Sequence, residues 1–93
     1  MTTYVHYRYR APGSSEEDEI KVETYPGKNL SDVLSLIRQV DDLILLKPDY
    51  PEQHGEGPKE YKVVALQPVS TQAGEDPQTV TNRVFVVLTD PDA

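Results

Sequence analysis

The 93-residue sequence contains no cysteine and no tryptophan. The absence of cysteine excludes disulfide-stapled small domains, thiolate metal sites and thiol nucleophiles. Long apolar runs are also missing: the longest, at residues 43–46 and 84–88, are far too short to cross a bilayer. The first twenty residues lack the apolar core of a signal peptide. We therefore expect a single intracellular, cytoplasmic domain with no membrane partner.

Positive charge is scarce. The sequence has nine Lys and Arg residues and sixteen Asp and Glu residues, which gives a formal net charge of -7. Such a charge repels nucleic acid and anionic membranes at long range. A partner is therefore expected to be another protein, with a neutral or basic surface.

Motifs that name a reaction are absent as well. The sequence has no phosphate-binding P-loop, no dinucleotide fingerprint and no paired-histidine zinc motif. Asp49, Glu52, His54 and Glu56 cluster in one acidic stretch, but their spacing fits no EF-hand or zinc-protease pattern. We predict no catalytic residue, no metal and no cofactor. The competing hypothesis, a small enzyme built from scattered residues, would require a polar pocket.

One short segment, from Tyr4 to Arg10, holds three of the six tyrosines and one of the two histidines. Its apolar and polar residues alternate, which predicts a β-strand with one apolar and one basic face. The apolar face would carry Val5, Tyr7 and Tyr9. The basic face would carry Tyr4, His6, Arg8 and Arg10.

The rest of the chain predicts one helix and four further strands. Asn29 is a favourable helix N-cap, and apolar residues recur at helical spacing as far as Val40. Residues 43–46 form an uninterrupted apolar run that predicts a short buried strand, and Pro68 is expected to end the strand that follows. The predicted strands are 3–10, 19–25, 43–46, 61–66 and 83–89, the predicted helix is 30–40, and the predicted mobile loops are 12–18, 47–60 and 67–81.

This order, ββαβββ, resembles that of ubiquitin-like β-grasp domains over residues 3–90. The resemblance implies an α+β fold in which one helix packs across one face of a mixed sheet, with the first and last strands parallel at its centre. The chain ends without the Gly-Gly of conjugated members, so we expect a non-conjugated module. A half-barrel and a ferredoxin-like arrangement remain alternatives.

In this arrangement alternate residues of the first and last strands face away from the helix. Ile20 and Val22 of the second strand would join the apolar face of the first. An aromatic and Arg-rich patch on an open sheet face is typical of protein-binding surfaces, so we predict a protein-protein interaction module. The predicted partner-binding residues are His6, Arg8, Arg10, Phe85 and Val87.

The pattern allows three other interpretations. Arg8 and Arg10 would be merely structural if they paired with Glu23 or nearby loop acids. A nucleic-acid platform is disfavoured because Tyr7 and Tyr9 lie on the face opposite the arginines. The alternative function is a small acidic inhibitor, of the kind viruses and phages use, that occupies a basic site through residues 16–19 and 49–60. A Val-rich sheet edge is compatible with a monomer or a weak homodimer.

Overall fold

A computed structural model describes residues 2–49, 57–72 and 80–92. These residues form one helix and a mixed five-stranded sheet, which confirms the predicted α+β class and the predicted order of elements. No helix among them is long and apolar enough to cross a membrane. The elements are β1 (Thr2–Tyr9), β2 (Asp18–Pro26), α1 (Leu30–Leu36), β3 (Leu43–Leu46), β4 (Lys59–Gln72) and β5 (Val80–Thr89).

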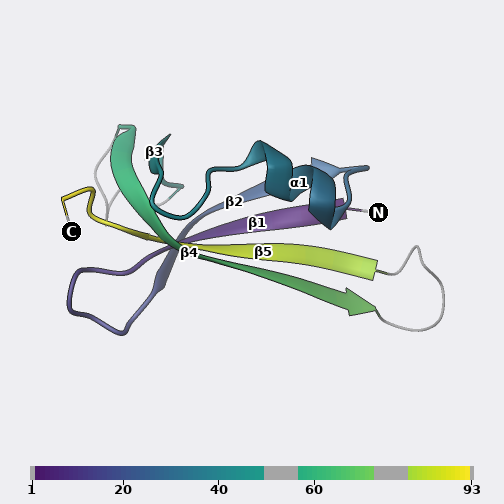
Figure 1. Ribbon diagram of the computed structural model, residues 1–93, viewed down its shortest axis with the longest axis horizontal. Helices are drawn as coiled ribbons and strands as arrows, with labels where there is room; N and C mark the ends of the chain where they lie inside the picture. Colours follow the sequence, from purple (N-terminus) through teal and green to yellow (C-terminus); the bar gives the residue numbers. More distant parts are fainter. Residues whose placement is uncertain (1, 50–56, 73–79, 93) are drawn as a thin grey trace.

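The first and last strands lie side by side at the centre of the sheet. The strand order is β2-β1-β5-β4-β3, and β1 and β5 are parallel whereas the other neighbouring strands are antiparallel. The prediction that these two strands would be parallel and central is therefore correct. Figure 1 shows α1 lying across one face of this sheet, which we call the inner face, and we call the opposite face the outer face.

The core lies between α1 and the inner face. Val33 and Ile37 carry the apolar side of the helix region into it, and alternate residues of β1 and β5 meet them from the sheet. Burying a side chain of this size contributes about 1.5–3 kcal/mol. The buried cluster consists of Val5, Tyr7, Ile20, Val33, Ile37, Leu46, Tyr61, Val63, Val84, Val86 and Leu88.

The helix begins as predicted and ends early. The Asn29 side chain accepts a hydrogen bond from the Asp32 backbone N–H at 2.8 Å, which caps the first turn. Ile37 is already extended, and the Gln39 side-chain amide donates to the carbonyl oxygen of Leu34 at 2.9 Å. These contacts satisfy a carbonyl that a longer helix would have bonded. The predicted extension to residue 40 is therefore wrong, and Val40 is exposed.

A bulge in β2 reverses the faces of its second half. Tyr7 pairs with Lys21 and Arg8 pairs with Glu19, so Ile20 is an extra residue between them. Ile20 is fully buried, whereas Val22 lies opposite His6 and is 39% exposed. The prediction that Val22 would share the apolar face with Ile20 is wrong because the extra residue shifts the alternation by one.

Strand β4 continues through Pro68 to Gln72, and β5 begins at Val80, so the predicted loop 67–81 is too long. The backbone directions explain why proline is tolerated. The Leu88 carbonyl accepts from the Arg10 N–H at 2.8 Å and so faces β1, and alternation makes Val84 face β1 too. Pro68, which pairs with Val84, therefore directs its backbone polar atoms to the side away from β5. Strand β3 covers β4 only over 59–62, so Pro68 lies on an open edge among the described strands.

Strand β3 is an edge strand, which makes its predicted burial wrong for half of its residues. Leu46 is buried, but Leu43 and Leu45 are exposed, Leu45 to 69%. Alternation sends Ile44 and Leu46 toward the core and the other two outward. An uninterrupted apolar run therefore marks an edge here instead of a strand buried on both faces.

The sheet is curled so that its two edges approach each other. Asp49, three residues after β3, donates its backbone N–H to the Ile20 carbonyl of β2 at 2.7 Å. Along the chain, the three residues after β3 and one hydrogen-bonded strand spacing allow at most about 16 Å between the end of β3 and β2. In a flat sheet β3 and β2 would be four strand spacings apart, about 19 Å. The opposite edges are thus joined by residues 47–49. Those residues belonged to a predicted mobile loop, but Asp49 has this fixed contact; residues 50–56 of that loop lie outside the described ranges.

Candidate partner-binding face

The structure brings the predicted site residues to one region of the outer face. His6 is the register partner of Phe85, and Arg8 is the register partner of Val87, across the central β1–β5 pair. Arg10 follows the end of β1, and its bond to Leu88 continues the ladder. All five therefore occupy adjacent positions, with the side chains of β1 and β5 alternating as the sequence predicted.

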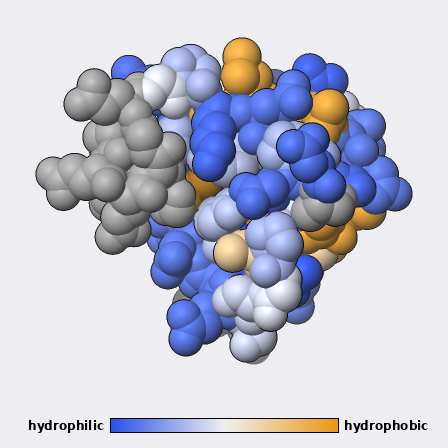
Figure 2. Space-filling model, turned by 90° about the vertical axis from the view of Figure 1, so that its left-hand side faces the viewer, coloured by the Kyte–Doolittle hydropathy of each residue, from blue (hydrophilic) through white to orange (hydrophobic). Residues whose placement is uncertain are grey.

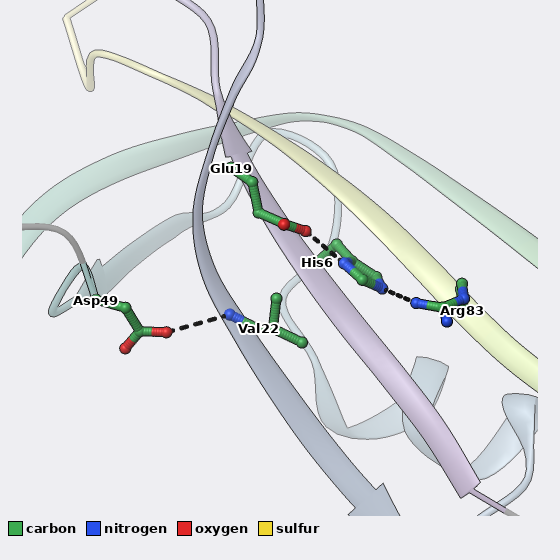
Figure 3. Close-up of polar contacts among 5 residues, drawn as sticks. All are labelled: His6, Glu19, Val22, Asp49 and Arg83. Carbon is green, nitrogen blue, oxygen red and sulfur yellow. Dashed lines mark hydrogen bonds and ion pairs between the residues drawn. The ribbon is translucent and has the colours of Figure 1, made fainter.

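A three-residue polar network runs across this face. The Arg83 Nη1 atom lies 2.7 Å from His6 Nε2, and His6 Nδ1 contacts the Glu19 carboxylate. Figure 3 shows His6 between these two partners. Since a guanidinium can only donate, His6 Nε2 accepts, and its proton belongs on Nδ1, where it donates to Glu19. His6 thus links a cation of β5 to an acid of β2.

Phe85 serves as a platform for its neighbours. The His6 ring stacks on it with centroids 5.0 Å apart and planes inclined by 25°. The Arg8 guanidinium carbon lies 4.4 Å from the centroid of the same ring. Such cation-π contacts contribute about 0.5–1 kcal/mol at exposed sites. Because its own neighbours contact the ring, Phe85 orients Arg8 and His6 more than it offers an apolar surface of its own.

The sequence prediction missed one member of this face, Arg83, although it placed Tyr4 there. Arg83 precedes Phe85 by two residues, and its guanidinium lies 5.1 Å from the centroid of the Tyr4 ring. The same alternation that selected Phe85 and Val87 places Arg83 beside them. The alternation in the sequence therefore already indicated Arg83. The prediction left it out because it began the patch on the last strand at Phe85.

The five predicted residues differ in how much surface they offer. His6 and Val87 are each 9% exposed, whereas Arg8, Arg10 and Phe85 are half-buried. Of the exposed large apolar side chains, Val22 lies next to this region on β2, whereas Leu43 and Leu45 point outward from the edge strand β3. In the end view of Figure 2 the hydrophobic residues show as separate areas among hydrophilic ones. The accessible chemistry of the candidate face is therefore mainly that of arginine.

Arg8 and Arg10 have no carboxylate partner among the described residues. The ion pairs there are His6–Glu19 and Lys21–Asp49. Glu19, which lies across from Arg8, is occupied by His6. Glu23 accepts instead from the Tyr25 hydroxyl at 2.8 Å, so the structural interpretation that paired the arginines with Glu23 is wrong.

Three tyrosines on the inner face have raised pKa values. Burial raises the pKa of Tyr9 to about 12, helped by its hydrogen bond to Asp90 at 2.8 Å. Burial and the hydrogen bond to Glu23 raise the pKa of Tyr25 to about 12. Burial, with the nearby Glu23 charge, also raises the pKa of Tyr7. These phenols are neutral members of the core and its border.

The acidic stretch considered as a metal site is described only in part. Asp49 contacts Lys21, with its Oδ1 3.4 Å from the Nζ atom. Glu52, His54 and Glu56 lie outside the described residues. Within the described ranges, no group of three His, Asp or Glu side chains is placed to hold a metal, and no enclosed pocket is present.

No protein-family model, curated protein or solved structure matches this chain. The likeness to ubiquitin-like domains therefore rests on the order of elements. Function has to be argued from the outer face itself.

Proposed function

We propose that the chain is a non-catalytic protein-binding module of the ubiquitin-like β-grasp type, and that its outer face contacts another protein. The ββαβββ order, the central parallel pair of β1 and β5, and the helix across one face support the β-grasp assignment. The one helix among the described residues packs against the inner face, and all described strands belong to one sheet. No described helix or strand is thus left to cover the outer face.

One observation carries the functional proposal. Arg8 is held over Phe85, 4.4 Å from the ring centroid, without a carboxylate partner among the described residues of a strongly acidic chain. Arginine and aromatic residues dominate the energetics of protein interfaces. An arginine kept in place by an aromatic ring loses less side-chain entropy when it binds, which favours recognition.

The test is affinity capture from an extract of the source cells, with captured proteins quantified by mass spectrometry. The double variant Arg8→Ala with Phe85→Ala is expected to lose the partners of the unaltered protein while its melting temperature changes little. Arg38→Ala, which removes an exposed arginine next to the helix end, is the matched control and is expected to retain them. Capture that survives the double variant would overturn the surface assignment.

The acidic-inhibitor alternative makes the opposite prediction. Glu16 and Glu17 are exposed in the β1–β2 connection, whereas Glu19 is occupied by His6. If the acidic residues carried binding, Glu16→Gln with Glu17→Gln would weaken capture and make it steeply salt-dependent. If the outer face carries it, the same variant leaves capture intact.

A further inference from the structure

Arg8 and Arg10, which have no carboxylate partner among the described residues, define the chemistry that a partner must supply. Arg8 and Arg10 are two positions apart, with Tyr9 between them, and the strand pairing continues to Arg10, whose N–H donates to the Leu88 carbonyl. Residues two apart on a strand share a face and lie about 7 Å apart. The outer face thus presents two guanidinium groups at the repeat distance of an extended chain.

The setting of Arg8 favours a carboxylate as the group that binds it. A guanidinium that lies over a ring keeps the N–H groups of its edge available. Those groups match the two oxygens of a carboxylate in a bidentate arrangement. Glu19 would be the intramolecular candidate for this role, but His6 already contacts its carboxylate.

The surrounding charges select against a dense polyanion. Glu16, Glu17 and Asp18 are exposed in and beside the hairpin connection that leads away from Arg10. The net charge of -7 repels long chains of phosphates at a distance. The net charge alone predicts a partner with a neutral or basic surface, but the guanidinium groups of Arg8 and Arg10 favour a local acidic contact instead. A short segment with two carboxylates carries less charge than a long chain of phosphates and is repelled less, and its apolar residues have Val22, 39% exposed on the same face, as a contact.

We infer that the partner of this face is an acidic segment in extended conformation whose carboxylates are two residues apart, one for Arg8 and one for Arg10. This inference rests on the proposed protein-binding function and specifies its partner. Phe85 and His6 then act as positioning residues, since they hold Arg8 without needing to contact the segment.

The experiment uses three capped peptides of equal length titrated into isotopically labelled protein and followed by NMR. One alternates leucine and glutamate, one alternates leucine and glutamine, and one has the same composition as the first with its glutamates contiguous. The alternating glutamate peptide is expected to bind at least about tenfold more tightly than the glutamine peptide. Its shifts should centre on the amides of β1 and β5 and on the Arg8 and Arg10 side chains.

Variants separate specific recognition from general attraction. Arg8→Gln is expected to weaken binding of the alternating peptide about tenfold, and Arg8→Lys is expected to recover only part of it because the planar fork is lost. Arg38→Gln removes the same charge elsewhere and is expected to leave binding unchanged. Equal weakening by Arg8→Gln and Arg38→Gln, or equal binding of the glutamate and glutamine peptides, would overturn the inference.

A titration with a single-stranded oligonucleotide tests the competing class of partner, nucleic acid. Tighter binding of the oligonucleotide than of the alternating peptide would also overturn the inference. These failures are distinguishable from failure of the proposed function. If capture is lost in the Arg8 and Phe85 double variant but no acidic peptide is preferred, the module stands and its partner chemistry is different.

Discussion

The two faces of the central β1–β5 pair are built from neighbouring residues and have opposite characters. On the inner face Val84, Val86 and Leu88 are buried in the core cluster. On the outer face Phe85 lies in contact with Arg8 and His6 in a polar network. Phe85 of the outer face is covalently joined to Val84 and Val86 of the inner face. Because successive residues of a β-strand point to opposite faces, one residue contributes to stability and the next is available for recognition.

This division teaches that the two properties can be altered separately. Substitutions on the inner face should change the free energy of unfolding, whereas substitutions on the outer face should change binding. The tyrosines follow the same division, since Tyr7, Tyr9 and Tyr25 pack in or against the core and Tyr4 lies beside Arg83 on the other face.

Alkaline pH should produce the largest effect, because it acts on several inner-face groups together. The raised pKa values of Tyr9 and Tyr25, about 12 against an ordinary 10, mean that the unfolded chain loses these protons first. Their contribution to stability is complete below pH 10, falls between pH 10 and 12, and is lost as the pH passes 12. Tyr7, whose pKa is also raised, adds to the fall.

Denaturant unfolding at a series of pH values, with tyrosinate absorbance recorded in parallel, measures this effect. Tyr25→Phe removes one of the titrating groups and should make the fall in stability shallower. A free energy of unfolding that stays flat over this pH interval would show that the inner face does not hold the phenols in their neutral form.

A matched pair of valines tests the difference between the faces directly. Val84 is 0% exposed on the inner face, and Val22 is 39% exposed on the outer face. Val84→Ala should lower the free energy of unfolding by about 2 kcal/mol through lost burial and the cavity left behind. Val22→Ala should lower it by less than about 1 kcal/mol. Equal losses in chemical denaturation would remove the distinction.

Tyr61 offers a smaller effect of opposite sign. Its side chain is fully buried, and among the described residues its hydroxyl has no hydrogen-bond partner. An unsatisfied buried polar group costs about 1–3 kcal/mol. Tyr61→Phe should therefore leave thermal stability unchanged or raise it by up to about 1 kcal/mol. A clear loss in calorimetry would reveal a partner for the hydroxyl.

Arg8 should show the smallest effect on stability. Arg8→Ala removes the contact with Phe85 and is expected to lower the free energy of unfolding by about 0.5 kcal/mol. Arg38→Ala supplies the comparison for an exposed arginine without that contact. A loss for Arg8→Ala as large as that for Val84→Ala would mean that the outer face is a structural element in its own right.

Much of this division could be predicted from alternation alone. The pattern of residues 4–10 and 84–88 correctly assigned Val5, Tyr7 and Leu88 to the core and placed His6 and Phe85 opposite them. Such assignments succeed because a regular strand has a fixed period. They fail where one backbone irregularity changes the count.

The bulge at Ile20 is such an irregularity, and it moved Val22 to the outer face. The prediction that Pro68 ends its strand failed for another reason. Proline ends a strand only where a neighbouring strand would need the N–H that proline lacks. Leu43 and Leu45 were expected to be buried, but burial depends on the strand order, which local periodicity does not contain. These three errors came from strand pairing, which no local pattern records; the early end of the helix is a separate, local error.

The proline at the open edge of β4 has a consequence for self-assembly. Sheets polymerise when an exposed edge offers an unbroken row of hydrogen-bond donors and acceptors to another molecule. At Pro68 that row lacks a donor in the middle of the strand. The opposite edge of the sheet is occupied at Ile20 by Asp49. One proline and one backbone hydrogen bond therefore break the row of free backbone groups at one point on each side of the sheet.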